Sequence, residues 1–277
     1  MNVTRLALGL QYDGSPWHGW QTQLSRNTVQ DQLELALLAF TQSAITTTCA
    51  GRTDAGVHAI EQVVHFDTSL DRPMSSWVRG LNAHLPSSIA VRWAHAVQQK
   101  INTEDGAAHI AERDFHARFS ARSRTYHYLL YNHPVRSPLW TGKAGWVFRQ
   151  LDIQKMHDAA QLLVGEHDFS AFRSVDCQAK SPVKTIHRIA LSQRDHVVMI
   201  TFQASAFLHH MVRNIVGSLV YVGTGRQPVE WIGSLIKQKN RHLAAPTFSS
   251  DGLYLAKIEY DPAWNLPQEA SPVLPYF

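Results

Sequence analysis

The sequence lacks several features that would assign it to a particular class of protein. Its 277 residues include only two cysteines, Cys49 and Cys177, too few for a disulfide framework. It has no run of roughly 20 apolar residues and no apolar N-terminal stretch with a cleavage site, so neither a membrane span nor a secretory signal is expected. These absences predict a cytoplasmic protein.

Metal-binding motifs are also missing, although the chain has 16 histidines. There is no HExxH motif and no paired CxxC, so we expect no metal site. His209 and His210 would lie about 100° apart on a helix, which predicts that they do not share a metal ion. The formal charge of +4 favours polyanionic partners only weakly, because many enzymes without such partners have a similar balance.

The order of expected elements predicts an α+β fold made of two similar halves. The first half reads β-α-β-β-α-β, the split βαβ (ferredoxin-like) plan, over residues 3–12, 28–42, 45–49, 62–67, 75–84 and 89–97. The second half repeats this order with one extra helix, over residues 124–132, 152–164, 185–193, 196–204, 206–222, 228–239 and 253–260. Two such halves would lie with their antiparallel sheets side by side around a central basic cleft.

The domain boundaries follow from this reading. We expect an N-terminal half at 1–112, a C-terminal half at 113–261 and a surface tail at 262–277. Residues 98–112 are polar and predict an exposed excursion between the halves. The alternation of apolar residues over 3–12 predicts a half-buried strand, and Thr28 with Asp31 is spaced as a capping pair for the helix that follows.

The segment GRTDAGVHA, residues 51–59, is the first candidate for chemistry. Gly51 and Gly56 flank Asp54, which allows a tight turn that directs the carboxylate outward. Asp54 could simply cap that turn. The neighbouring Arg52, however, makes the loop suited to a polyanionic substrate.

The second candidate is FHARFSARSRTYHYLLYN, residues 115–132. If this segment is one extended chain, its even positions are basic and aromatic and include Tyr126, whereas its odd positions are largely apolar. Basic side chains contact phosphates and aromatic rings stack on unpaired bases, so this face is expected to meet RNA. The alternative is an ordinary solvated strand face, and a kink at Ser120 or Ser123 would break the alternation.

The third candidate is the apolar segment FLHHMVRNIVGSLVYVG, residues 207–223. It predicts a helix buried on most sides with Arg213 in its middle. A buried guanidinium needs an acceptor, so Arg213 is expected to face a polar cleft and pair with an acid. Asp54 is a plausible partner, and another core acid is nearly as good.

Two further features are weaker. Asp13 lies in YDGS, where an ordinary turn explains it. Trp17, His18 and Trp20 form an aromatic loop that either contacts RNA or closes the edge of the core.

Six separated motifs together resemble the tRNA pseudouridine synthase A family. They are YDGSPWHGWQ (12–21), GRTDAGVHA (51–59), QVVHF (62–66), FHARFSA (115–121), YHYLLYN (126–132) and HHMVRNIVG (209–217), and the resemblance runs on to GLYLAKIEY (252–260). It implies the two-domain pseudouridine synthase fold, a homodimer, and isomerisation of uridine in the anticodon stem-loop of tRNA, at positions 38–40. It also implies that no metal or organic cofactor takes part.

The resemblance assigns roles to four residues. Asp54 would be the essential carboxylate, and the ring of Tyr126 would pack against the target base. Arg213 would be the ion-pair partner of Asp54. Arg52 would hold the flipped nucleotide or fill its place in the stem. The excursion at 98–112 is longer than expected for the family.

Two other functions remain possible from the residues alone. Split βαβ units also build non-catalytic RNA-binding proteins, but the chain lacks a Lys/Arg-Gly-aromatic string, and Asp54 would then have no role. A small-molecule lyase or hydrolase could also use Asp54, in which case the basic and aromatic face would be incidental.

Overall fold

The computed structural model describes residues 3–97 and 114–268, which form two compact units. The first unit runs to Arg122 and resumes at Ala256, and the second spans Ser123–Leu255. The predicted excursion at 98–112 lies outside the described residues, as does the boundary predicted between 112 and 113. The same is true of the end of the predicted tail, from residue 269.

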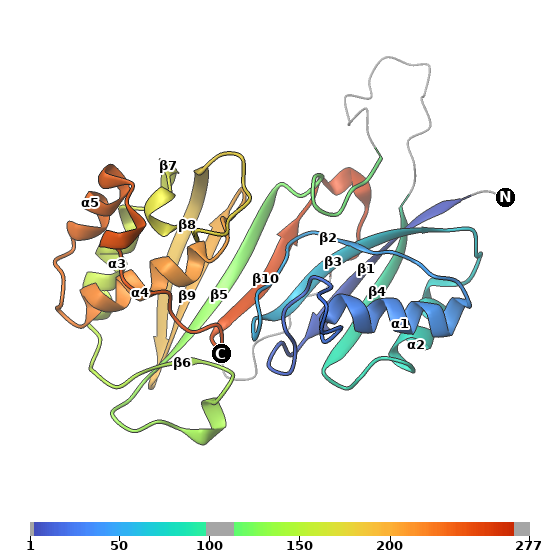
Figure 1. Ribbon diagram of the computed structural model, residues 1–277, viewed down its shortest axis with the longest axis horizontal. Helices are drawn as coiled ribbons and strands as arrows, with labels where there is room; N and C mark the ends of the chain where they lie inside the picture. Colours follow the sequence, from blue (N-terminus) through green and yellow to red (C-terminus); the bar gives the residue numbers. More distant parts are fainter. Residues whose placement is uncertain (1–2, 98–113, 269–277) are drawn as a thin grey trace, which may run out of the picture. The chain divides into compact units, whose positions relative to one another are not determined.

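The part of the first unit before residue 98 contains four antiparallel strands and two helices. Its elements are β1 (Thr4–Tyr12), α1 (Val29–Thr41), β2 (Thr48–Cys49), β3 (His58–Thr68), α2 (Met74–Asn82) and β4 (Ile89–Val97). Strand β1 pairs with β3 and β4, and β2 pairs with β3, so these strands lie in the order β4–β1–β3–β2. This is the predicted split βαβ plan. Figure 1 shows α1 and α2 on one face of this sheet.

A buried tryptophan joins the helices of the first unit to its sheet. The ring centroid of Trp77, on α2, lies 5.3 Å from that of Phe40 on α1 and 5.5 Å from that of Phe66 on β3. Trp77 is fully buried. Large aromatic rings bury much apolar surface, so this cluster fixes both helices against β3.

Strand β1 is buried on both faces between Leu6 and Leu10, so the prediction of a half-buried strand is wrong. The residues between the leucines are small because other groups occupy that face. The indole of Trp93, on β4, lies against Gly9, where an added Cβ would come within 2.1 Å of its Nε1. A small residue in an alternating pattern can therefore be covered by a large side chain of the neighbouring strand instead of facing solvent.

The strands of the second unit are mainly antiparallel. Its elements are β5 (Ser123–Asn132), η1 (Pro138–Trp140), β6 (Gly145–Val147), α3 (Ile153–Gln161), β7 (Gly165–Asp168), η2 (Ser170–Phe172), β8 (Val183–Arg194), β9 (Val197–Ala204), α4 (Met211–Gly223), α5 (Trp231–Gln238) and η3 (Arg241–Leu243). Strands β5, β9, β8 and β7 pair antiparallel in that order, and β6 pairs parallel with β5. The predicted α+β class is confirmed. Strands β6 and β7 were not predicted, because three or four residues show no alternation.

Strand β10 (Leu253–Glu259) carries the chain from the second unit back into the first, and the short helix η4 (Pro262–Trp264) follows. The longest helices among the described residues, α1 and α4, have 13 residues each. No helix in the described part of the chain is long and apolar enough to cross a membrane.

Helix α4 begins at Met211, not at the predicted residue 206. His210 has a left-handed backbone (φ 61°), and the Met211 N–H donates to the Leu208 carbonyl, so residues 208–211 form a turn. The apolar spacing continues through this turn, which is why the sequence predicted a longer helix. The helix is buried on most sides, as expected, but Arg213 lies in its first turn and not in its middle.

The expected alternation over 115–132 is wrong before Ser123. The Ser120 N–H donates to the His116 carbonyl over 2.8 Å, which closes a turn, and β5 starts only at Ser123. Tyr128 is fully buried, and its hydroxyl donates to the Ser249 carbonyl over 2.7 Å. The even-numbered residues of β5 are therefore not a uniform solvent face.

Candidate active site

Asp54 lies in the loop between β2 and β3, as the sequence predicted. The Val57 N–H donates to the Asp54 carbonyl over 3.1 Å, which closes a tight turn. Gly56, the third residue of this turn, has φ 78°, a conformation that favours glycine. The Asp54 side chain is partly exposed. The turn therefore presents a carboxylate that solvent reaches.

The start of this loop is fixed by a buried glutamine on β3. Gln62 is fully buried, its Nε2 donates to the Gly51 carbonyl over 2.6 Å, and its Oε1 accepts from the Gly51 N–H over 3.3 Å. The hydroxyls of Thr53 and Tyr12 are hydrogen bonded at 2.8 Å. Gln62, Thr53 and Tyr12 were not predicted as site residues. A polar side chain next to the apolar pair Val63 and Val64 was the available signal for Gln62.

A second loop, residues 13–28, holds the Asp54 loop from its other side. The Trp20 N–H donates to the Thr53 carbonyl over 3.0 Å, and the Gly56 N–H donates to the Trp17 carbonyl over 3.3 Å. Gly19 has φ 91°, and a Cβ there would lie 2.7 Å from the Thr53 carbonyl oxygen and 3.0 Å from the Asp54 carbonyl carbon. Only glycine permits this backbone approach.

The aromatic residues of the 13–28 loop divide between core and surface. Trp20 is buried, with its ring centroid 6.1 Å from that of Tyr12, so it closes the edge of the core. His18 is exposed and contacts the Ser25 hydroxyl at 3.2 Å. Of the two functions considered for this loop, core packing is therefore correct for Trp20.

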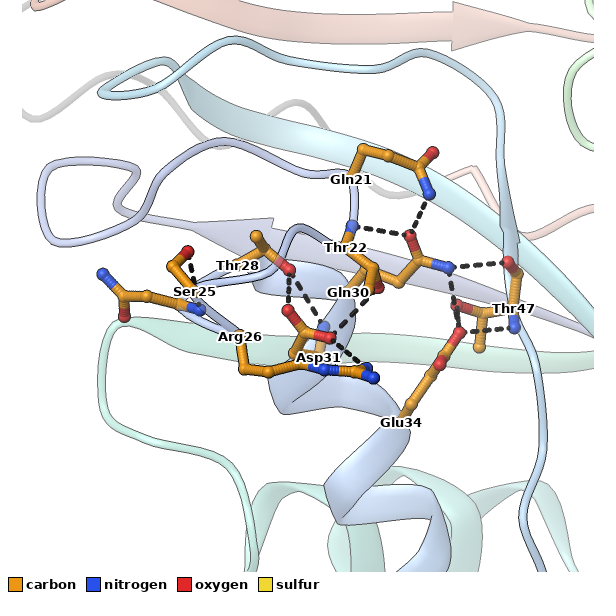
Figure 2. Close-up of polar contacts among 10 residues, drawn as sticks. Gln21, Thr22, Ser25, Arg26, Thr28, Gln30, Asp31, Glu34 and Thr47 are labelled. Atoms are coloured by element: carbon orange, nitrogen blue, oxygen red, sulfur yellow. Dashed lines mark hydrogen bonds and ion pairs between the residues drawn. The ribbon is translucent and has the colours of Figure 1, made fainter.

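The 13–28 loop is anchored where it enters α1 (Figure 2). The Thr28 hydroxyl accepts from the Asp31 N–H over 3.2 Å and donates to the Asp31 carboxylate over 2.5 Å, so the predicted capping pair is confirmed. Gln30 accepts from both the Gln21 side chain and the Thr22 N–H. These contacts fix the loop that in turn fixes Asp54.

Asp13 forms the predicted turn and one contact more. Its Oδ1 accepts from the N–H and the hydroxyl of Ser15, at 3.0 Å and 2.7 Å. The same oxygen lies 3.1 Å from Nδ1 of His58, which is buried at the start of β3. The Gly14 N–H donates to the same His58 nitrogen over 3.0 Å, and this hydrogen bond joins the 13–28 loop to β3.

Two neighbours of Asp54 have contrasting side chains. Arg52 is exposed, and its guanidinium has no hydrogen bond or ion pair with any residue of the described ranges 3–97 and 114–268. Its guanidinium donors can therefore meet a ligand without breaking an internal contact. Burial raises the pKa of the Cys49 thiol to about 12, so Cys49 is not a nucleophile at neutral pH.

The second unit carries the other two predicted site residues. Tyr126 lies on β5 opposite Phe202 of β9, and the edge of its ring meets Phe207, with centroids 5.1 Å apart. Arg213 donates from Nε to the Phe248 carbonyl over 2.9 Å. The predicted pairs of Asp54 with Arg213 and with Tyr126 join residues of different units and stay predictions.

A buried asparagine next to Arg213 organises the surrounding loops. Asn214 is fully buried, and its Nδ2 donates to the Phe172 carbonyl over 2.8 Å. Its Oδ1 accepts from Arg241 Nη2 at 3.0 Å and from the Thr247 hydroxyl at 2.7 Å. Asn214 was not predicted as important. It stabilises the segment that includes Phe248, the hydrogen-bond partner of Arg213.

His209 and His210 lie before α4, not on it. Their ring centroids are 3.9 Å apart, so the expectation of side chains about 100° apart on a helix is wrong. The left-handed backbone of His210 brings the two rings together.

Comparison with known proteins identifies the family of this chain. A family model described as tRNA pseudouridine synthase matches residues 10–104 and 159–261, well over half of the chain. The chain belongs to the tRNA pseudouridine synthase family. The matched residues include the Asp54 loop, Arg52 and Arg213, whereas Tyr126 lies outside them.

Individual relatives are similar over nearly the whole chain. The tRNA pseudouridine synthase A of Herminiimonas arsenicoxydans is 66% identical over 264 residues, which cover 95% of this chain and 92% of the relative. Those of Janthinobacterium sp. (strain Marseille) and Bordetella petrii are 63% and 56% identical, and each covers 95% of this chain and 94% of the relative. The predicted resemblance to the tRNA pseudouridine synthase A family is confirmed.

Proposed function

We propose that this protein converts uridine to pseudouridine in the anticodon stem-loop of tRNA, at positions 38–40, with Asp54 as the essential carboxylate. Its family membership makes it an isomerase that acts on uridine in tRNA. The observation that carries the choice of residue is the Asp54 loop, a carboxylate on a turn that two sets of backbone contacts hold in place.

The reaction breaks the N1–C1′ bond of uridine, turns the base and joins C5 to C1′. A base within a stem must leave its stack to be reached, which costs a few kcal/mol that contacts to phosphates and rings must offset. Arg52, exposed beside Asp54, suits the phosphate role, and Tyr126 supplies a ring that packs on the extruded base. Arg213 is proposed to pair with Asp54.

A positioned carboxylate can act on this substrate in three ways. It can attack C1′, add to C6 of the base, or remove a sugar proton on the way to a glycal. Each of them needs an ionised Asp54 held at a fixed place relative to the nucleotide. The fixed loop supports that requirement, because little motion remains to be lost when the substrate binds.

The partners and location of the protein are part of the proposal. The site acts on tRNA, and we infer that the protein is a homodimer in the cytoplasm. Sedimentation of the purified chain tests the dimer, with a single species of 31.2 kDa as the contrary result. Mapping pseudouridine in tRNA from a strain that lacks the protein tests positions 38–40.

Asp54→Asn tests the role of Asp54 directly. The variant keeps the size of the side chain and removes its charge, so we expect it to fold, to bind tRNA and to lose more than about 10³-fold in rate. The assay measures tritium released from tRNA that carries the label at uridine C5. Asp71→Asn, at an exposed carboxylate of the same unit, is the control and should keep the wild-type rate.

The assay also separates the rival functions. Release of tritium by Asp54→Asn at the wild-type rate refutes the role of Asp54. If the wild-type protein releases none but binds tRNA, it is a non-catalytic RNA-binding protein. Affinity for tRNA that does not weaken with salt favours a small-molecule enzyme.

A further inference from the structure

The second unit has an open hollow that none of the proposed site residues lines. Its volume is about 380 Å³, within the range of sites that hold small ligands. Its wall includes Ser174, Arg241, His242 and Thr247, and no acidic residue lines it. The lining residues therefore include a guanidinium, an imidazole and two hydroxyls, and no carboxylate is among them.

Arg241 is held only by neutral acceptors. Its Nη1 donates to the Ala245 carbonyl over 2.8 Å, and its Nη2 donates to Asn214 Oδ1 and the Thr247 hydroxyl over 3.0 Å and 3.2 Å. Within residues 3–97 and 114–268, its Nε–H and its second Nη1–H have no acceptor, and no carboxylate pairs with it. Burial lowers the pKa of Arg241 from its ordinary value. A partly buried cation without an anion is costly, and a bound anion would stabilise it.

The geometry of Arg241 is fixed before any ligand arrives. Two of its three acceptors, Asn214 and Thr247, are themselves hydrogen bonded to each other, and Asn214 is fully buried on α4. The guanidinium therefore cannot turn away to seek another partner. A preorganised guanidinium with spare donors is the arrangement that recognises phosphate oxygens.

We propose that this hollow, called here the Arg241 hollow, binds a phosphodiester group of the tRNA backbone. The inference rests on the proposed function, because it is the tRNA that supplies the phosphodiester. Such contacts fix the position of an RNA on a protein without reading its sequence. The Arg241 hollow would thus help to hold the tRNA while the target uridine is at Asp54.

Ser174→Glu tests the Arg241 hollow without touching the contacts of Arg241. The new carboxylate would repel the phosphate, so tRNA affinity should fall about fivefold to tenfold at moderate salt. At subsaturating tRNA the rate of tritium release should fall by about the same factor, because a smaller fraction of the protein then holds tRNA. Ser192→Glu, at an exposed serine of β8 in the same unit, is the matched control and should bind tRNA nearly as well as wild type.

Arg241→Gln supplies an independent measurement. The slope of log affinity against log salt should become shallower by roughly 0.7 to 0.9, the change for one lost phosphate contact. Thermal unfolding without RNA shows whether the variant folds. If Arg241→Gln does not fold, the affinity of Ser174→Glu for tRNA is the only test of the Arg241 hollow.

Three results would overturn the inference. Ser174→Glu could bind tRNA as wild type does, or Ser192→Glu could weaken binding equally, which would indicate a general charge effect. Alternatively, inorganic phosphate could raise the unfolding temperature of wild type but not of Ser174→Glu, with tRNA affinity unchanged, which would assign the hollow to a small free anion. Failure of the proposed function differs from all three, because the wild-type protein would then release no tritium.

Discussion

The two units hold their chemically important side chains in different ways. In the first unit, Asp54 lies on a loop, and its position depends on close backbone contacts with a second loop that contains Gly19. In the second unit, Tyr126 lies on a strand and Arg213 on a helix, so regular hydrogen bonding already fixes their backbones. There the side chains of Asn214 and Arg241 hold the neighbouring loop.

The difference shows what each site residue depends on. A carboxylate on a loop keeps its place only if another segment restrains that loop, and a backbone-to-backbone contact requires glycine. An arginine on a helix instead needs acceptors for its guanidinium, and the Phe248 carbonyl is one of them here. Substitutions should therefore affect catalysis most strongly in the first unit and stability most strongly in the second.

Gly19→Ala should have the largest effect. The added Cβ would meet the backbone of Thr53 and Asp54, and the positive φ disfavours alanine, so the loop must shift. We expect the rate of tritium release to fall about 100-fold and the unfolding free energy to fall by about 2 kcal/mol. Gly225→Ala is the control, because Gly225 has φ 73° but open space around it. Equal losses of activity in the two variants would contradict the proposed restraint of the Asp54 loop.

Asn214→Ala tests the second unit. It removes the partner of the Phe172 carbonyl, of Arg241 and of Thr247, so the unfolding free energy should fall by about 2 to 3 kcal/mol, as measured by urea titration. Ser218→Ala, equally buried on α4, loses only a bond to the Asn214 carbonyl and should cost less than about 1 kcal/mol. Similar losses in both variants would show that Asn214 is not the organising residue.

His65 should make the first unit sensitive to acid. Burial, followed by the charges of Arg5 and His116, lowers the pKa of His65 to about 4, while Asp67 and a hydrogen bond to Thr48 act in the opposite direction. The unfolded chain, with a pKa near 6.5, binds more protons between pH 4 and 6.5, so stability rises with pH across that window. The contribution of His65 to the unfolding free energy is therefore fully present above about pH 6.5 and is lost as the pH falls towards 4.

The expected contribution of His65 is roughly 1 to 2 kcal/mol, less than the full pKa shift because water screens part of its surroundings. Urea titrations of the wild type and of His65→Gln at several pH values measure it. The variant should lose less stability than the wild type on going from pH 7 to pH 4.5. Parallel curves would exclude His65 as the source.

Tyr12→Phe should have the smallest effect. It removes the hydrogen bond to Thr53 at 2.8 Å and a longer one from Gln62 Nε2 at 3.5 Å, which should cost about 1 kcal/mol of stability and lower the rate a few-fold because Thr53 adjoins Asp54. Tyr254→Phe removes a similar bond, to the Lys143 carbonyl, in the second unit. It should cost similar stability with no change in rate. A slower rate in Tyr254→Phe would contradict the expectation that hydrogen bonds of the second unit affect stability but not the rate.

Much of the fold and part of the candidate site could be predicted from the sequence. The α+β class, the order of elements in the first unit, the Thr28 cap and the turn at Asp54 all depend on local spacing and on glycine, which act over a few residues. The family resemblance rested on separated motifs in the right order, and the comparisons confirmed it.

Tertiary structure alone decided the rest. The apolar spacing at 207–210 is equally compatible with a helix and with the turn that forms, and Gly9 gave no sign that Trp93 covers it. The contact of Gly19 with the Asp54 loop and the role of Asn214 join residues more than 25 positions apart. Local patterns record only neighbours along the chain, whereas packing depends on which distant segments meet.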